Sequence, residues 1–155
     1  MKKITKELLD NLSKQAKASP RKRMNYNFHE NMDDTLHRML NAIEPGSYIQ
    51  PHKHENPDKA EAFVVLRGKF LAISFDNNGT VTDHSVLSPE DCMFGVDIKP
   101  RVWHTIIALE QDSIIYECKD GPWQQMNDKN FAEWAPKEGD ENAQEYMQNL
   151  IDSLT

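Results

Sequence analysis

Short apolar segments separated by turn residues fill the middle of the chain and limit the folds open to it. The segments run over residues 36–43, 48–54, 62–67, 69–76, 80–87, 92–98, 102–109 and 113–119. Between them lie breakers such as Pro45-Gly46, Asn56-Pro57 and Asn78-Gly79, and an Asn-Gly pair is a strong hairpin signal. About eight short strands without long helices between them predict an all-β sandwich or barrel rather than a parallel α/β fold.

Both ends of the chain predict short helices. Apolar residues repeat at helical spacing over residues 4–17, and Ser19-Pro20 ends that helix because the residue before proline avoids the α region. An apolar stripe from Ala143 to Leu154 predicts a final helix with Asp140 as its N-cap, packed on its own domain or on a second copy. We expect one domain: an N-terminal helix over 1–20, a barrel over 21–123, and an aromatic flap and helix over 124–155.

His52 and His54 are candidate metal ligands. Two histidines one residue apart on an extended segment project to the same side, and a carboxylate follows at Glu61. Two imidazoles and one carboxylate suit a divalent transition metal better than calcium or magnesium. Glu55 is another candidate, but it points away from His54 if the strand continues. By itself the pair could also be two exposed histidines on a half-polar strand.

The wider pattern resembles the two-part signature of the cupin superfamily. The string G-x5-H-x-H-x6-E-x6-G runs from Gly46 to Gly68, and Pro100-Arg-Val-Trp-His104 follows. The gap before Glu61 is longer than is usual in cupins, and the second motif lacks its glycine and is one residue short. The resemblance implies an antiparallel β-barrel of the jelly-roll type. It also implies a zinc, iron, nickel or manganese ion, with these ligands: His52, His54, Glu61 and His104.

Further motifs are similar to those of the WbuC family of cupin-fold metalloproteins. They are Arg23-x-Asn25-x-Asn27-x-His29, His37-Arg-Met39, F-D-x-x-G at 75–79, E-x-K-x-G-P-W at 117–123 and W-A-P-x-E at 134–138. The resemblance implies a bacterial protein associated with O-antigen and surface polysaccharide gene clusters, without supplying a reaction. We consider a metal-dependent enzyme acting on a sugar or nucleotide-sugar (an isomerase or epimerase), an iron-dependent dioxygenase, and a non-catalytic module that binds a small molecule.

Residues 21–29 supply candidate substrate contacts. Arg21 and Arg23 belong to a local basic cluster, which is either a solvated helix end or a rim that binds the phosphates of a ligand. Between residues 23 and 29 polar and apolar side chains alternate, as on a strand. We predict that Asn27 and His29, on the polar side, reach the mouth of the metal pocket.

Composition and charge limit the partners and the cellular location that we expect for the protein. A formal net charge of −7 argues against nucleic acid as a partner. The longest apolar run, Ala62 to Leu66, is too short to span a bilayer, and the N-terminus lacks the apolar stretch of a secretory signal. Cys92 and Cys118 have no metal-binding or redox spacing, so we expect reduced residues of a cytoplasmic protein. The resemblance to small cupin barrels also suggests a homodimer.

Overall fold

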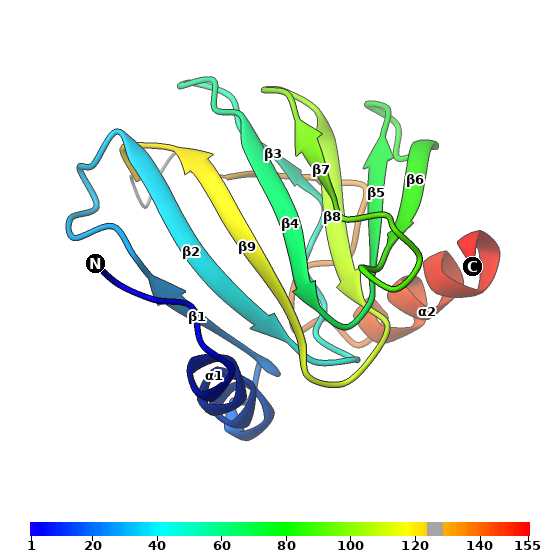
Figure 1. Cartoon of the computed structure of the whole chain (residues 1–155). Helices are drawn as coiled ribbons and strands as arrows, with labels where there is room; N and C mark the ends of the chain where they lie inside the picture. Colours follow the sequence, from blue (N-terminus) through cyan, green and yellow to red (C-terminus); the bar gives the residue numbers. More distant parts are fainter. Residues whose placement is uncertain (124–128) are drawn as a thin grey trace.

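Two five-stranded antiparallel sheets pack face to face in the computed structural model, which describes residues 1–123 and 129–155 (Figure 1). One helix lies at each end of the chain. This arrangement confirms the predicted all-β fold with terminal helices. No helix of the described residues is both long enough and apolar enough to cross a membrane.

The first sheet has the strand order β1-β2-β9-β4-β7. Its strands are β1 (Arg23–Asn27), β2 (Leu36–Ile43), β9 (Ser113–Asp120), β4 (Glu61–Arg67) and β7 (Gly95–Ile98). The second sheet has the order β10-β3-β8-β5-β6. Its strands are β10 (Asn130–Phe131), β3 (His52–Lys53), β8 (Trp103–Ala108), β5 (Phe70–Phe75) and β6 (Val81–Leu87).

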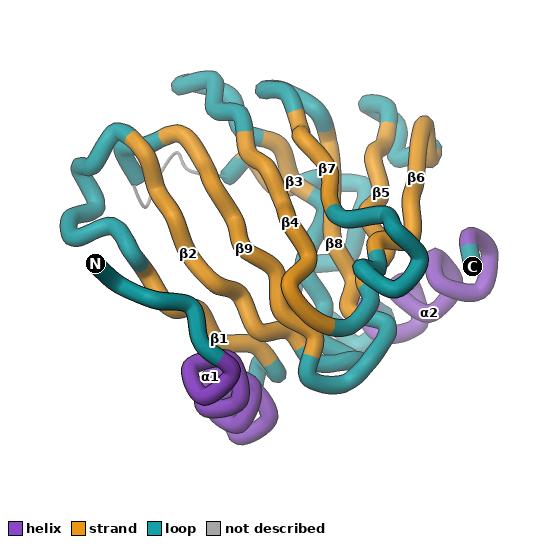
Figure 2. Tube along the Cα trace, in the orientation of Figure 1, coloured by secondary structure: helices purple, strands orange, loops and turns teal. Residues whose placement is uncertain are grey.

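The strands of the two sheets lie opposite one another (Figure 2). Alternation along the strands places one apolar face of each sheet against the other. The buried residues of this core are Ile43, Phe63, Val65, Phe70, Ala72, Leu87, Ile106, Ala108 and Ile115. The turn from β4 to β5 requires the glycine noted in the sequence. Gly68 has φ +77°, and a Cβ there would lie 2.1 Å from Ser113 Oγ.

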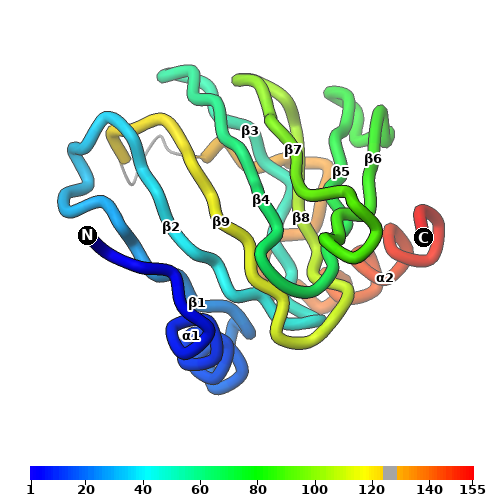
Figure 3. Tube along the Cα trace, in the orientation of Figure 1, coloured from blue at the N-terminus to red at the C-terminus, as the bar shows by residue number. Residues whose placement is uncertain are grey.

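Helix α1 (Lys6–Ala18) covers the outer face of the first sheet. It begins after Thr5, whose side chain accepts a hydrogen bond from the Leu8 N–H. Leu12 and Ala16 are buried against Leu40 and other residues of β2 and β9. The chain therefore enters the first sheet directly from a helix that is packed on it (Figure 3).

Helix α2 (Ala143–Leu154) covers the outer face of the second sheet. Ala143 and Met147 are buried with residues of β5 and β8, so the apolar stripe packs on its own domain. The helix begins three residues after the predicted cap. Asp140 accepts a hydrogen bond from the Lys137 N–H instead, and Asn142 precedes the helix without a side-chain cap.

The segment predicted as a flap contributes a strand and an aromatic cluster, with residues 124–128 outside the described part of the chain. β10 pairs with β3 and places Phe131 opposite His52. Trp134 packs between Phe75 and Trp103. The segment therefore adds an edge strand to the second sheet beside β3.

The strand predicted over 48–54 is much shorter in the structure, where only His52–Lys53 is extended in the sheet. Pro51 has no N–H to donate to a neighbour, and its carbonyl accepts from the Ala132 N–H. Likewise, the strand predicted over 92–98 begins at Gly95, since Cys92 has a positive φ of 59°. In both cases the residues that were predicted as strand but are not part of one lie in a loop that leads into a sheet.

Candidate metal centre

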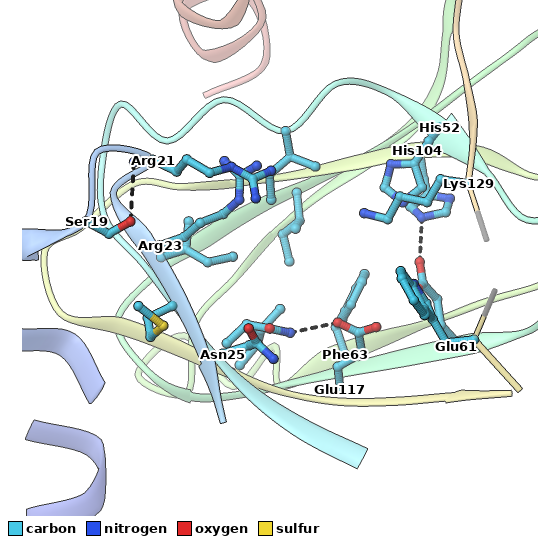
Figure 4. A pocket seen from close by; sticks show the side chains of 17 residues that line it. Ser19, Arg21, Arg23, Asn25, His52, Glu61, Phe63, His104, Glu117 and Lys129 are labelled. Carbon is cyan, nitrogen blue, oxygen red and sulfur yellow. Dashed lines mark hydrogen bonds and ion pairs between the residues drawn. The ribbon is translucent and has the colours of Figure 1, made fainter. Parts of the chain in front are cut away.

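Four buried side chains from separate parts of the chain converge between the sheets: His52, His54, Glu61 and His104. One ligand atom from each lies within 4.8 Å of the others. His52 and His104 are directly opposite each other on β3 and β8, and Glu61 reaches them from β4 (Figure 4). Glu55 is not in this group, because its carboxylate pairs with Lys53.

The ligand atoms are close together without being satisfied by one another. Glu61 Oε1 lies 2.5 Å from His104 Nε2, and Glu61 Oε2 lies 3.4 Å from His54 Nε2. Glu61 Oε1 and His104 Nε2 are both buried and make no hydrogen bond of acceptable geometry with the described residues. A buried polar atom of this kind costs free energy unless it is bound. The donor set therefore fits a bound cation.

Backbone carbonyls orient two of the three imidazoles. His52 Nδ1 lies 3.0 Å from the Gln50 carbonyl oxygen, and His104 Nδ1 lies 2.8 Å from the Val102 carbonyl oxygen. A carbonyl only accepts, so Nδ1 carries the hydrogen in both rings and Nε2 keeps its lone pair for a metal. Such contacts fix ring orientation in metal sites.

Burial and neighbouring charge set the protonation states that a metal needs. Burial, followed by the charges of Lys129 and His104, lowers the pKa of His52 well below its usual value. Burial alone would raise the pKa of Glu61, but its contacts with His104 and His54 bring that pKa well below the ordinary range. Neutral imidazole and ionised carboxylate are the forms that coordinate a divalent cation.

A cavity of about 640 Å³ extends from this cluster between the sheets (Figure 4). His52, Glu61 and His104 line one end, and Arg21 and Arg23 line the other. The wall between the two ends contains both polar and apolar side chains. Its polar residues include Asn25, Asn41 and Glu117, and its apolar residues include Ile43, Phe63, Ile106 and Ile115.

Glu117 is a cavity residue that sequence reasoning did not identify as a site residue. Its side chain is largely buried, and its Oε2 accepts a hydrogen bond of 2.7 Å from Asn41 Nδ2. The Nζ of Lys119 lies 3.8 Å from its other oxygen. Burial, and then the charge of Glu61, raises the pKa of Glu117. The available signal was its place at the start of the E-x-K-x-G-P-W motif.

Arg21 and Arg23 line the cavity, and both bind Glu138, which the sequence analysis placed in a motif but not among the site residues. Arg21 Nε and Nη2 donate to the two oxygens of Glu138 at 2.6 and 2.7 Å. Arg23 Nη2 donates to Glu138 Oε2 at 2.7 Å. The hydrogen bond from Arg21, together with Arg23, lowers the pKa of Glu138 to about 2. Glu138 therefore stays ionised beside two arginines that line the cavity.

Asn27 and His29 do not take the positions predicted for them. Neither is among the described residues that line the cavity, and Asn25 lies there instead. The ring of His29 stacks on His37 with centroids 4.1 Å apart, and its Nδ1 lies 3.3 Å from the Arg38 backbone nitrogen. Asn27 Oδ1 accepts a hydrogen bond from Asn25. Of the polar row, Arg23 and Asn25 line the cavity, whereas His29 packs on His37.

Solved structures with low sequence identity share the fold. KdgF from Halomonas sp. is 19% identical, with a TM-score of 0.53 over 70% of this chain and 86% of that one. CapF, a capsular polysaccharide assembling protein from Staphylococcus aureus, is 21% identical, with a TM-score of 0.58 over 69% of this chain and 28% of that one. A structure from work on the DMSP lyases RdDddP and RnDddQII is 13% identical, with a TM-score of 0.54 over 72% and 53%.

These likenesses show a cupin fold, and at such identities they show the fold alone. No curated protein matches the chain. A family described as a domain of unknown function, DUF6016, matches residues 4–87, a span that contains His52, His54 and Glu61 and ends before His104. Because that match covers more than half of the chain, the chain belongs to the DUF6016 family.

Proposed function

We propose that this cupin-fold protein holds one divalent transition metal at His52, His54, Glu61 and His104. We further propose that it acts on a sugar or nucleotide-sugar in surface polysaccharide (O-antigen) biosynthesis, as an isomerase or epimerase. The observation that carries the proposal is the buried convergence of these four donors at one end of a cavity of about 640 Å³. Zinc, iron, nickel and manganese all suit such a donor set.

The residues around the metal have distinct roles in this proposal. A bound divalent ion would polarise a ligand carbonyl or hydroxyl, or acidify a water molecule. His52 and His104, held through Nδ1, keep their Nε2 atoms aimed at the ion. Glu61 supplies the negative charge of the donor set. The four side chains are buried, and a lower effective dielectric there strengthens each of these interactions.

The cavity wall supports a polyhydroxylated ligand. Asn41 and Glu117 form a hydrogen-bonded pair on the cavity lining, and Asn25 lies on the same lining. Amides and carboxylates placed in this way can donate to and accept from sugar hydroxyls. The volume is within the range of roughly 300–1,000 Å³ that small-molecule sites occupy.

Contacts between separate motifs support the likeness to the WbuC family, from which the polysaccharide pathway is inferred. Arg23 of the first motif binds Glu138 of the last one. A Cβ on Gly79 of the F-D-x-x-G motif would lie 2.6 Å from the Trp134 ring. The fold similarity to a capsular polysaccharide assembling protein agrees with this pathway and, at 21% identity, does not carry it.

Elemental analysis of protein purified without a histidine tag tests the proposal. We expect stoichiometric metal in the wild type, and metal loss without loss of the fold in His52→Ala and His104→Ala. His84→Ala is the matched control, because His84 is an exposed histidine of β6 outside the cluster. Full metal occupancy in either ligand variant would contradict the assignment.

Metal identity and turnover then separate the functions. Iron, with oxygen consumed when a substrate is added, would favour the iron-dependent dioxygenase. Another metal, with turnover within a panel of nucleotide-sugars, would favour the proposed enzyme. A metal-loaded protein that binds members of the panel without turnover would be the non-catalytic binding module.

A further inference from the structure

A carboxylate of the chain binds two arginines that line the cavity. Glu138 lies between Arg21 and Arg23 and receives three hydrogen bonds from them, at 2.6 to 2.7 Å. We propose that the two arginines form a phosphate-binding site that Glu138 masks in the ligand-free protein. On this proposal, which rests on the proposed function, the phosphate of a phosphorylated sugar or nucleotide-sugar replaces the Glu138 carboxylate.

The geometry of the three residues suits this exchange. Arg21 binds both oxygens of Glu138 through Nε and Nη2, the paired arrangement with which guanidinium groups bind either carboxylate or phosphate. A phosphate has one more oxygen in reach than a carboxylate. It can accept from both arginines at once without sharing an oxygen between them.

Arg23 is held in place independently of Glu138. Its Nη1 donates to Ser47 Oγ at 3.1 Å and to the Tyr48 carbonyl at 3.0 Å, and its side chain is only 17% exposed. Burial lowers the pKa of Arg23 and the hydrogen bond with Glu138 opposes that change, so the guanidinium is a partly desolvated cation beside an anion. The guanidinium would therefore keep its position, and its need for an anion, after Glu138 departs.

The two arginines and the metal cluster belong to one cavity, which fixes how a ligand would lie. Arg21 and Arg23 line the end opposite His52 and His104. A phosphorylated sugar would place its phosphate at the arginines and extend its sugar past Asn41 and Glu117 toward the metal. A metal-bound sugar and an arginine-bound phosphate are then parts of the same molecule.

Replacement of Glu138 would release one attachment of the C-terminal segment and leave others. Tyr48 Oη still donates to the Pro136 carbonyl at 2.7 Å, and Gln144 Nε2 still donates to the Gly46 carbonyl at 3.1 Å. Ligand binding would thus loosen the segment around residue 138 without detaching α2. This change can be measured in the wild-type chain.

Calorimetry with inorganic phosphate as the probe tests the masked site. Glu138→Gln removes the competing charge, so it should bind phosphate at least about tenfold tighter than the wild type. Glu141→Gln is the matched control, since it changes the charge equally at an exposed position of the same segment. Adding Arg21→Ala to Glu138→Gln should abolish the gain. Each titration is repeated after chelation, because phosphate can also bind a metal.

A second measurement does not depend on the variants folding. Saturating phosphate should speed hydrogen exchange at residues 135–140 of the wild-type protein and leave β5 unchanged. Equal phosphate affinity in Glu138→Gln and Glu141→Gln would overturn the inference. So would a gain that survives Arg21→Ala, phosphate binding that disappears on chelation, or unchanged exchange at residues 135–140.

Metal content measured on the same samples separates the two proposals. A protein that holds no metal before chelation and still gains phosphate affinity in Glu138→Gln would refute the metal function and keep the masked site. A metal-loaded protein without that gain would refute the masked site and leave the metal function in place.

Discussion

His52 and His104 face each other across the β3–β8 pair, with their ring centroids 4.5 Å apart. They are separated by more than fifty residues in the sequence, and one antiparallel register brings them together. Each ring is oriented by a backbone carbonyl two residues before it. The same kind of backbone contact thus fixes the orientation of both imidazoles. Glu61 joins the group from the opposite sheet.

Replacing Glu61 should weaken metal binding far more than replacing Glu55. Glu61→Gln removes the only carboxylate of the cluster, and we expect metal affinity to fall at least about tenfold, as even outer contacts of metal sites have effects of that size. Glu55→Gln should leave the affinity unchanged, because Glu55 pairs with Lys53 outside the cluster. Competition with a chromogenic chelator measures both. Equal losses in the two variants would remove Glu61 from the ligand set.

The stacked pair of His29 and His37 should make stability depend on pH. Burial, and then the neighbouring His29, lowers the pKa of His37 in the folded protein. The unfolded chain therefore takes up the proton first, so this contribution is present above the unfolded pKa of about 6.5 and is lost as pH falls toward the folded pKa. Urea unfolding between pH 7.5 and 5.5 should show declining stability.

A variant separates His37 from other groups that titrate in the same range. His37→Gln keeps a side-chain donor for the Met32 carbonyl, which lies 3.0 Å from His37 Nε2. Its stability should fall less steeply with decreasing pH than that of the wild type, with both proteins treated with chelator. An unchanged slope would assign the pH dependence to other residues.

Gly79→Ala should destabilise the fold more than Gly139→Ala. Both glycines have a positive φ, of 86° and 97°, so both substitutions strain the backbone. Only at Gly79 would the new Cβ also meet a side chain, 2.6 Å from the Trp134 ring, whereas at Gly139 nothing lies within 4 Å. We expect Gly79→Ala to cost about 1–3 kcal/mol more in the free energy of unfolding. Equal costs would show that Trp134 does not restrict this turn.

Local patterns predicted much of the architecture. The segment 36–43 is a strand with the predicted bounds, because its apolar residues and the Pro45-Gly46 turn fix it locally. The first helix, predicted over 4–17, is observed over Lys6–Ala18. The convergence of His52, His54, Glu61 and His104 was expected from the cupin resemblance, and in the structure these residues form one buried cluster.

Predictions that depended on long-range partners were less successful. Asn27 and His29 have the right alternation for a pocket wall, but β1 is the edge strand of its sheet, with β2 and β9 between it and β4, and His29 packs on His37. Glu138 could not be predicted as the partner of Arg21 and Arg23, since it lies more than a hundred residues away on an irregular segment. Strand β10 has only two residues and no periodicity to detect.

Most of the strands, both helices and the kinds of ligand atom could be predicted from the sequence, because side-chain periodicity and turn chemistry act over a few residues. Which polar groups share the cavity could not be predicted in that way. That depends on sheet register and on the path of the C-terminal segment, and these are set by contacts between residues distant in the chain. The metal cluster at one end of the cavity and the two arginines at the other are consequences of that packing.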